Sequence, residues 1–183
     1  STIKNKPISF EVFSDDFNGM ERQAMKIAGW GDNVYVKIPI TNTKKESSKE
    51  LIKRLAEKNV KLNITAIFTL DQVKTVMPIL NKDVPSIISV FAGRLADTGL
   101  DPIPLMKDCL NEMKINSKSE LLWASTRELL NIFQADQIGC HIITVTKDII
   151  KKLPLINYDL EDYSMDTVKA FYKDAVEAKF KIN

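Results

Sequence analysis

Short apolar runs alternate along this chain with segments in which apolar residues recur every three or four positions. The first pattern predicts buried β-strands and the second predicts amphipathic helices. The expected strands span residues 8–13, 34–39, 60–68, 86–91, 121–124 and 141–145. The expected helices span residues 20–28, 47–56, 69–80, 101–114, 125–135, 147–153 and 165–178. Strand and helix therefore alternate, as in repeated βα units.

Polar signatures mark where several of these helices are expected to start. Capping-box sequences, in which Ser or Thr is followed three positions later by Glu or Gln, stand at residues 47–50, 69–72 and 125–128. Asp101 followed by Pro102 combines a good N-cap with proline at the first helical position. Glu50 and Arg54 are spaced for an ion pair within a helix. Residues 92–100 are expected to form a loop.

Two architectures are built from repeated βα units: a doubly wound sheet and a (β/α)8 barrel. No glycine-rich phosphate loop follows an expected strand, which weakens the dinucleotide-binding form of the doubly wound sheet. The sequence contains no linker and no low-complexity stretch. We therefore expect an α/β fold in which residues 1–183 form one domain.

Composition narrows the class of protein. Hydrophobic residues make up 44% and charged residues 27% of the chain, and the net charge of +2 predicts no broad electrostatic field for nucleic acid or an anionic membrane. No apolar run approaches the roughly 18 residues of a membrane span, and nothing resembles a signal peptide. Cys109 and Cys140 lack CxxC spacing, so a reducing cytoplasm is expected. One histidine and two cysteines argue against a transition-metal site.

The apolar run V-Y-V-K-I-P at residues 34–39 carries one lysine, Lys37. An ammonium group is costly to bury unless it is paired with a carboxylate or gives up its proton. A desolvated amine is also the nucleophile that forms Schiff bases. The alternative is that Lys37 lies at the strand end and reaches water.

Side-chain alternation places further polar groups on the face of Lys37. If Lys37 faces the inside of a barrel, the same alternation turns inward Tyr35, Ser9, Glu11, Phe13, Asn63, Thr65, Ile87, Ser89, Phe91, Trp123 and Ser125. A barrel interior that only supports the fold is filled by Val, Ile and Leu. Several polar side chains near the strand ends instead predict a binding or catalytic site.

Four charged residues are expected near this site, and the sequence leaves two roles open for each. Glu11, one strand away from Lys37, either moves protons through a water molecule or is a plain salt-bridge partner. Arg94 and Arg127 follow their strands, and Arg127 is expected in the first turn of a helix opened by Ser125. A helix N-terminus with an arginine favours phosphate, although each arginine alone is also compatible with a surface charge. Asp97 either orients Arg94 or ends a loop.

Four segments carry a family resemblance: V-K-I-P-I-T at residues 36–41, N-I-T-A-I-F-T at 63–69, S-V-F-A-G-R-L-A-D at 89–97 and A-S-T-R at 124–127. They are similar to the V-K-I-P-x-T, N-x-T-x-I-F-S, S-P-F-V-G-R-I-x-D and A-S-F-R segments of the transaldolase family. The chain resembles in particular the small branch of that family, which includes fructose-6-phosphate aldolases. The resemblance covers nearly the whole chain.

The resemblance implies a (β/α)8 TIM barrel of the class I aldolase type and a Schiff base on Lys37, with Glu11 working through a catalytic water. It implies that phosphorylated sugars bind the residues that face the site: Asn63, Thr65, Ser89, Phe91, Arg94, Ser125 and Arg127. A dihydroxyacetone unit would pass from fructose 6-phosphate or sedoheptulose 7-phosphate to an aldose phosphate, as in the pentose phosphate pathway. No metal or organic cofactor is expected, because the iminium is the electron sink. Small family members form rings through the C-terminal helix, so a homo-oligomer is expected.

The sequence also departs from the family pattern. Val90 replaces the usual proline and Thr126 the usual phenylalanine. Phe91 and Glu11 stand where fructose-6-phosphate aldolases carry tyrosine and glutamine, which favours transfer over simple aldol cleavage. The family's first two βα units, with L-D-T-A-like and T-T-N-P-like segments, are missing.

The missing units leave several interpretations open. We expect the chain to correspond to strands three to eight of the family barrel and to be a fragment of a longer protein, unless something else completes the sheet. The alternatives for function are a fructose-6-phosphate aldolase-like enzyme and a catalytically silent subunit that binds sugar phosphates or serves in assembly.

Overall fold

A computed structural model of the chain describes residues 6–179. It divides into two compact units, Ser1–Thr146 and Lys147–Asn183. The strands are β1 (Ile8–Glu11), β2 (Val34–Pro39), β3 (Leu62–Ile67), β4 (Ser86–Val90), β5 (Ser119–Trp123) and β6 (Ile142–Ile143). The first unit's helical segments are α1 (Phe17–Ala28), α2 (Lys49–Glu57), α3 (Leu70–Val76), η1 (Met77–Ile79), α4 (Ala92–Ala96), α5 (Pro102–Met113) and α6 (Leu130–Gln137). That residues 1–183 act as one domain stays a prediction.

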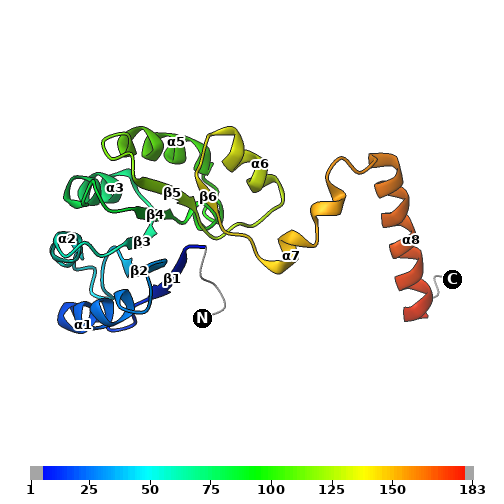
Figure 1. The fold of residues 1–183 in the computed structure, drawn as a ribbon. Helices are drawn as coiled ribbons and strands as arrows, with labels where there is room; N and C mark the ends of the chain where they lie inside the picture. The colour runs from blue at the N-terminus through cyan, green and yellow to red at the C-terminus, as the bar shows by residue number, and fades with distance from the viewer. Residues whose placement is uncertain (1–5, 180–183) are drawn as a thin grey trace. The chain divides into compact units, whose positions relative to one another are not determined.

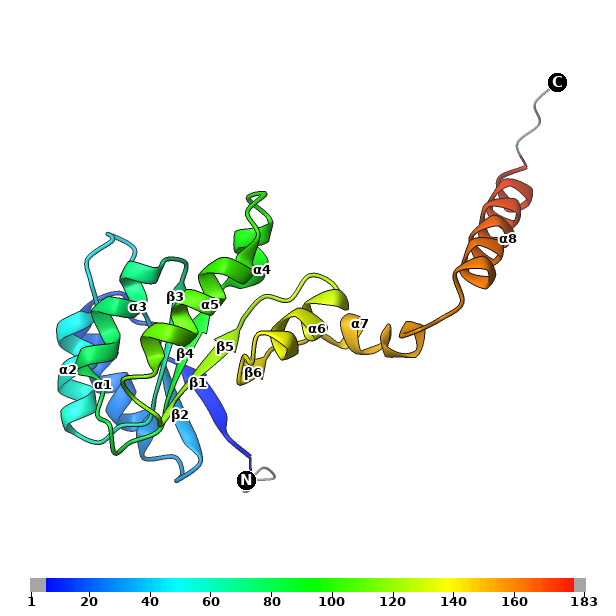
Figure 2. The ribbon, with the colours of Figure 1, turned by 90° about the horizontal axis from the view of Figure 1, so that it is seen from above.

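The strands form one six-stranded sheet in the order β1-β2-β3-β4-β5-β6. Every strand runs parallel to the next one in the sequence. Helices follow the strands, and Figures 1 and 2 show α1, α2, α3 and α5 on one side of the sheet. A doubly wound sheet reverses direction at a switch point, whereas a barrel advances by one strand at each crossover. The α/β fold with barrel winding is therefore confirmed.

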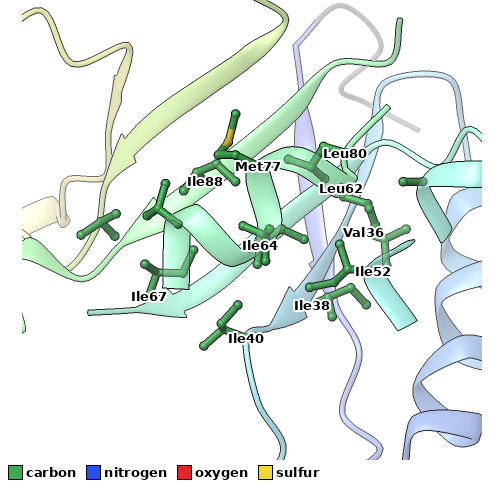
Figure 3. Packing of buried hydrophobic residues seen from close by; sticks show 14 of the residues in the cluster. Val36, Ile38, Ile40, Ile52, Leu62, Ile64, Ile67, Met77, Leu80 and Ile88 are labelled. Carbon is green, nitrogen blue, oxygen red and sulfur yellow. The ribbon is translucent and has the colours of Figure 1, made fainter. Parts of the chain in front are cut away.

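The two faces of the sheet carry different apolar clusters. The larger cluster joins strand residues such as Val36, Ile38 and Ile64 to helix residues such as Ile52 and to Met77 (Figure 3). Burying each of these side chains contributes about 1.5–3 kcal/mol. A smaller cluster on the other face contains Tyr35, Ile87, Leu122 and Ala124. The alternation predicted for β2 and β4 is thus confirmed.

For β5, the predicted assignment of residues to the two faces of the sheet is wrong by one position. Trp123 is fully buried in the larger cluster, which has room for its indole ring among the helix side chains. Its neighbours Leu122 and Ala124 face the other way. Ser125 nevertheless reaches the predicted face, because its φ of 60° places it in the left-handed region and breaks the alternation.

Strand ends differ from the prediction at both edges of the sheet. The first strand ends at Glu11, because the backbone N–H groups of Phe13 and Ser14 donate to Gln23 Oε1 at 2.9 and 3.0 Å rather than to a strand. Phe13, expected inside, is 90% exposed. The sixth strand is only Ile142–Ile143.

Two of the predicted helix starts are confirmed. At α3, Gln72 N–H donates to Thr69 Oγ1 at 3.3 Å and Thr69 N–H donates to Gln72 Oε1 at 3.1 Å, which completes the capping box. At α5, Ile103 N–H donates to Asp101 Oδ1 at 2.9 Å, with Pro102 in the first turn. Polar caps of this kind satisfy backbone donors that the helix itself leaves free.

Three other local predictions are wrong. Ser47 forms a bridge with Thr41, and α2 starts at Lys49 without a side-chain cap. Arg54 pairs with Glu21 of α1 at 2.8 Å rather than with Glu50. The expected loop at residues 92–100 contains the helix α4.

The second unit consists of α7 (Lys147–Ile150), η2 (Leu153–Leu155) and α8 (Leu160–Ala178). Pro154 lies in η2, so the helix expected over residues 147–153 is shorter. The helix expected from residue 165 starts earlier, at Leu160, with Asp159 as its N-cap. Within residues 6–179, no helix is both long and apolar enough to cross a membrane.

Candidate active site

A cavity of about 340 Å³ lies where the carboxyl ends of the strands meet. Ten residues line it, each from one of the six strands or from the segment that directly follows it: Ser9, Lys37, Asn63, Thr65, Ser89, Phe91, Leu122, Ala124, Ser125 and Thr144. Six of these are sequence-predicted site residues: Lys37, Asn63, Thr65, Ser89, Phe91 and Ser125. The carboxyl ends of barrel strands are where such folds carry their active sites.

Lys37 meets the carboxylate of Glu11 at the edge of this cavity. The parallel register of β1 and β2 sets the two residues side by side, and Lys37 Nζ lies 3.3 Å from Glu11 Oε2. The side chains are 29% and 49% exposed, respectively. A partly exposed ion pair contributes only about 0–1 kcal/mol to stability. The pairing agrees with both roles left open for Glu11, salt-bridge partner and proton carrier.

A hydrogen-bonded chain crosses the cavity face beside Lys37. Asn63 Nδ2 donates to Ser9 Oγ at 3.0 Å, and Ser89 Oγ donates to Asn63 Oδ1 at 2.7 Å. Asn63 and Ser89 are 3% and 2% exposed, so the bond between them is shielded from bulk water, whereas Ser9 is exposed and its bond with Asn63 is only partly buried. These two hydrogen bonds fix the orientation of the Asn63 amide, with its nitrogen toward β1 and its oxygen toward β4.

Thr65 brings a hydroxyl to the cavity. The residue is 2% exposed, and Thr65 Oγ1 has no hydrogen-bond partner among the described residues. The strand register shifts directly after it, between Ile64 and Ile67, where Ala66 has a φ of 58°. Irregularities of this kind re-aim side chains near active sites. Buried hydroxyls ordinarily bond to something, so this oxygen is suited to a bound ligand.

The two arginines lie beside the cavity rather than in its lining. Arg94 Cζ is 5.2 Å from the ring centroid of Phe91, a cation–π distance. Arg127 Nε donates to Asp97 Oδ1 at 3.0 Å, and Arg127 Nη2 donates to Asp97 Oδ2. Asp97, which the sequence led us to expect either to orient Arg94 or to end a loop, therefore holds Arg127.

The helical environment expected for Arg127 is also wrong. The helix α6 begins at Leu130, so neither Ser125 nor Arg127 belongs to its first turn. The N–H of Glu128, which would donate to Ser125 in the expected capping box at residues 125–128, donates instead to Asn131 Oδ1 at 3.0 Å. Arg127 instead lies in an irregular segment between β5 and α6.

Sequence reasoning did not identify Gly93 or Thr144 as part of this region. Gly93 N–H donates to Ala124 O at 3.1 Å, and a Cβ placed on Gly93 would lie 1.6 Å from Ser125 O. Thr144 N–H donates to Trp123 O at 3.0 Å, which brings its side chain to the cavity. The one available sequence signal was a glycine two residues after the expected strand 86–91, since glycine is favoured where backbones approach closely.

The cysteines are poor candidates for nucleophiles. Burial, with a smaller effect of Asp108, raises the pKa of the Cys109 thiol to about 12. Burial also raises the pKa of Cys140. Because the thiolate is the reactive form, both side chains are inert at neutral pH. Within residues 6–179, no three His, Cys, Asp or Glu side chains cluster as they would around a metal ion.

The chain has an α/β fold whose parallel strands follow one another in order, as in a barrel, and its candidate site brings together an amine and a carboxylate at the strand ends. The family model for transaldolase/fructose-6-phosphate aldolase matches residues 1–182, and the chain belongs to this family. A "probable transaldolase" of Clostridium acetobutylicum is 32% identical over 177 residues, covering 94% of this chain and 79% of the relative. Proteins with the same printed name are 34% identical in a Sulfurihydrogenibium species, covering 90% and 73%, and 30% identical in Clostridioides difficile, covering 100% and 79%.

Proposed function

We propose that the chain transfers a dihydroxyacetone unit from a ketose phosphate to an aldose phosphate through a Schiff base on Lys37. The observation that carries this proposal is the position of Lys37, at a cavity and 3.3 Å from the carboxylate of Glu11. Membership of a family of transaldolases and fructose-6-phosphate aldolases supports it. The location in a cytoplasm and the place in the pentose phosphate pathway stay predictions.

In the proposed reaction, Lys37 gives a proton to Glu11 and its neutral Nζ attacks the ketone carbon. Glu11 returns this proton to the hydroxyl of the resulting carbinolamine, water leaves, and an iminium remains. The Glu11 carboxylate, now free of the proton and acting through water, removes the proton of the hydroxyl on the carbon that departs when the carbon–carbon bond breaks. The bond electrons move to the iminium nitrogen, an aldose phosphate leaves and an enamine stays on Lys37. The enamine carbon then attacks the acceptor aldehyde, and hydrolysis frees the lysine.

The remaining predicted residues are assigned to substrate binding. Asn63, Ser89 and Thr65 offer an amide and two hydroxyls to the sugar hydroxyls, while Phe91 supplies an apolar wall. The phosphate is assigned to a second set of residues, Arg94, Ser125 and Arg127. The unpartnered hydroxyl of Thr65 supports a ligand at this position, because it is buried yet accepts and donates no hydrogen bond to the described protein.

Borohydride trapping tests the proposed function directly. The chain is incubated with fructose 6-phosphate, reduced with borohydride, digested and sequenced by mass spectrometry. We expect one reduced three-carbon or six-carbon adduct on the peptide that contains Lys37. Adding an aldose phosphate before reduction should lower the adduct and yield a new ketose, which separates transfer from simple aldol cleavage. A folded sample without an adduct would instead support a silent, sugar-phosphate-binding subunit.

Glu11→Gln is expected to lower kcat for the transfer reaction by about 10²- to 10⁴-fold, because glutamine keeps the shape of the side chain but cannot carry a proton. The free energy of unfolding should change by no more than about 1 kcal/mol, since the ion pair with Lys37 is partly exposed. Steady-state kinetics and urea unfolding measure the two effects. Glu50→Gln is the matched control, because Glu50 is exposed and away from the cavity. A kcat within twofold of the original would reduce Glu11 to a salt-bridge partner.

We further propose that α8 joins this chain to a second copy. The helix exposes a run of apolar residues, with Val168 at 61%, Phe171 at 68% and Tyr172 at 73% exposure. Burying such side chains against a partner is favourable. Native mass spectrometry should show an oligomer that Phe171→Glu converts to monomers, while the control Asp174→Asn on the same helix leaves it intact. A monomeric unmodified chain would contradict this proposal.

A further inference from the structure

The two arginine-bearing segments are connected at two points. The segment after β4 carries Gly93, Arg94 and Asp97, and the segment after β5 carries Ser125 and Arg127. The first connection is the close backbone approach of Gly93 to Ser125, with the hydrogen bond from Gly93 N–H to Ala124 O. This approach sets the distance between the backbones but leaves the long arginine side chains free to move.

The second connection is the ion pair between Asp97 and Arg127. Two parallel hydrogen bonds run from Nε and Nη2 of the guanidinium to the two carboxylate oxygens. Asp97 is itself fixed at the end of α4, where its N–H donates to Gly93 O at 3.2 Å. Arg127 is fixed at its backbone too, because its N–H donates to Asn131 Oδ1 at 3.0 Å. The side chain is therefore held at both ends.

A guanidinium has five N–H donors on a rigid plane, and a carboxylate occupies only one edge of it. Here Asp97 occupies the Nε and Nη2 edge, which leaves the two Nη1 hydrogens and one Nη2 hydrogen for another anion. The pair is about half exposed, with side-chain exposures of 46% and 51%. Such pairs add little stability, so its main consequence is the restricted orientation of Arg127.

We propose that Asp97 is a positioning residue for phosphate binding: it holds Arg127 in one orientation so that the free edge of the guanidinium receives the phosphate of the sugar. This inference rests on the proposed function. A fixed side chain loses less conformational freedom when the phosphate binds, which strengthens binding. The opposing effect is repulsion between the carboxylate and the phosphate, which solvent screens at these exposures.

The test compares Asp97→Asn with two other variants of the full chain. Asparagine keeps the size of the side chain but removes its charge and one acceptor. Asp97→Glu keeps the carboxylate and should recover part of the effect. Glu128→Gln is the matched control, because it also removes one negative charge and lies next to Arg127 in the sequence. The Glu128 carboxylate is exposed and does not contact the guanidinium.

Isothermal titration with inorganic phosphate gives the binding constant directly. We expect Asp97→Asn to weaken binding by about three- to tenfold and Glu128→Gln to leave it unchanged. In kinetics, the KM for fructose 6-phosphate should rise by the same factor with little change in kcat, while values for unphosphorylated fructose stay constant. Tighter phosphate binding by Asp97→Asn would overturn the inference and make Asp97 a competitor of the phosphate. An equal effect on both sugars would also overturn it, in favour of a general structural role.

The result is separable from the fate of the proposed function. Failure of borohydride trapping in the original chain would remove the Schiff-base reaction, whereas phosphate titration does not depend on Lys37. An original chain that forms the Lys37 adduct but binds no phosphate would overturn the inference alone.

Discussion

Lys37→Ala should abolish the borohydride-trapped adduct and lower kcat by about 10⁴- to 10⁶-fold, the range expected when a covalent nucleophile is removed. The variant loses the only amine that lines the cavity in the described part of the chain. It should still fold, because Lys37 is 29% exposed and its partner Glu11 is 49% exposed and free to be solvated by water. Circular dichroism and unfolding in urea check that condition before the kinetics are compared.

Two controls isolate the covalent role of Lys37. Lys37→Arg keeps a positive charge opposite Glu11 but cannot form an imine, so it should be as inactive as the alanine variant. Lys74→Ala removes an exposed lysine of α3 and should keep both the activity and the adduct. If Lys37→Ala still forms a reduced adduct with fructose 6-phosphate, the nucleophile is another lysine and the proposed reaction at Lys37 is wrong.

The part of the site on β2, β3 and β4 was predictable from sequence because these strands are fully flanked by others. Their side chains must alternate between two buried faces, so an apolar run with Lys37 or Asn63 inside it fixes the register of the whole strand. The prediction held for Thr65 even though the next residue, Ala66, leaves regular strand geometry. For β3, alternation counted from the start of the strand was sufficient to assign Thr65 to the cavity face.

The same argument failed at β5, because the residues were assigned to the faces of the sheet with an error of one position. The indole of Trp123 is fully buried in the cluster among the helices, and Leu122 and Ala124 line the cavity in its place. Ser125 was nonetheless assigned to the correct face, but through a backbone conformation with positive φ that non-glycine residues seldom adopt. Nothing in the local sequence A-S-T-R announces that conformation.

The arginine region depends on contacts that sequence patterns do not encode. The ion pair between Asp97 and Arg127 joins residues 30 positions apart. Arg54 likewise leaves its helical neighbour for Glu21, 33 positions away. Capping and ion-pair patterns consider only partners that are close in the sequence. Here tertiary contacts of similar or greater strength decided which partner each side chain binds.

Gly93→Ala is expected to destabilise the chain by about 2–4 kcal/mol, the largest stability effect that we predict. The added Cβ would lie 1.6 Å from Ser125 O and 2.5 Å from Ser125 C, both of them backbone atoms that cannot move aside as a flexible side chain would. Ser125 already has a φ of 60°, so it has little conformational freedom left to absorb the displacement. Relief requires α4 and the segment after β5 to separate.

That separation should also be visible in ligand binding, because it moves Arg94 away from Arg127. We expect a weaker affinity for inorganic phosphate in molecules of Gly93→Ala that remain folded, measured at low temperature by titration. Gly29→Ala is the matched control: its φ is −78° and a Cβ would lie 3.5 Å from its nearest neighbour, an ordinary contact. Its unfolding midpoint in urea should move little, corresponding to about 0.5 kcal/mol or less. Equal midpoints for Gly93→Ala and Gly29→Ala would show that the two segments are free to move apart, and a fixed distance between their backbones would then be untenable.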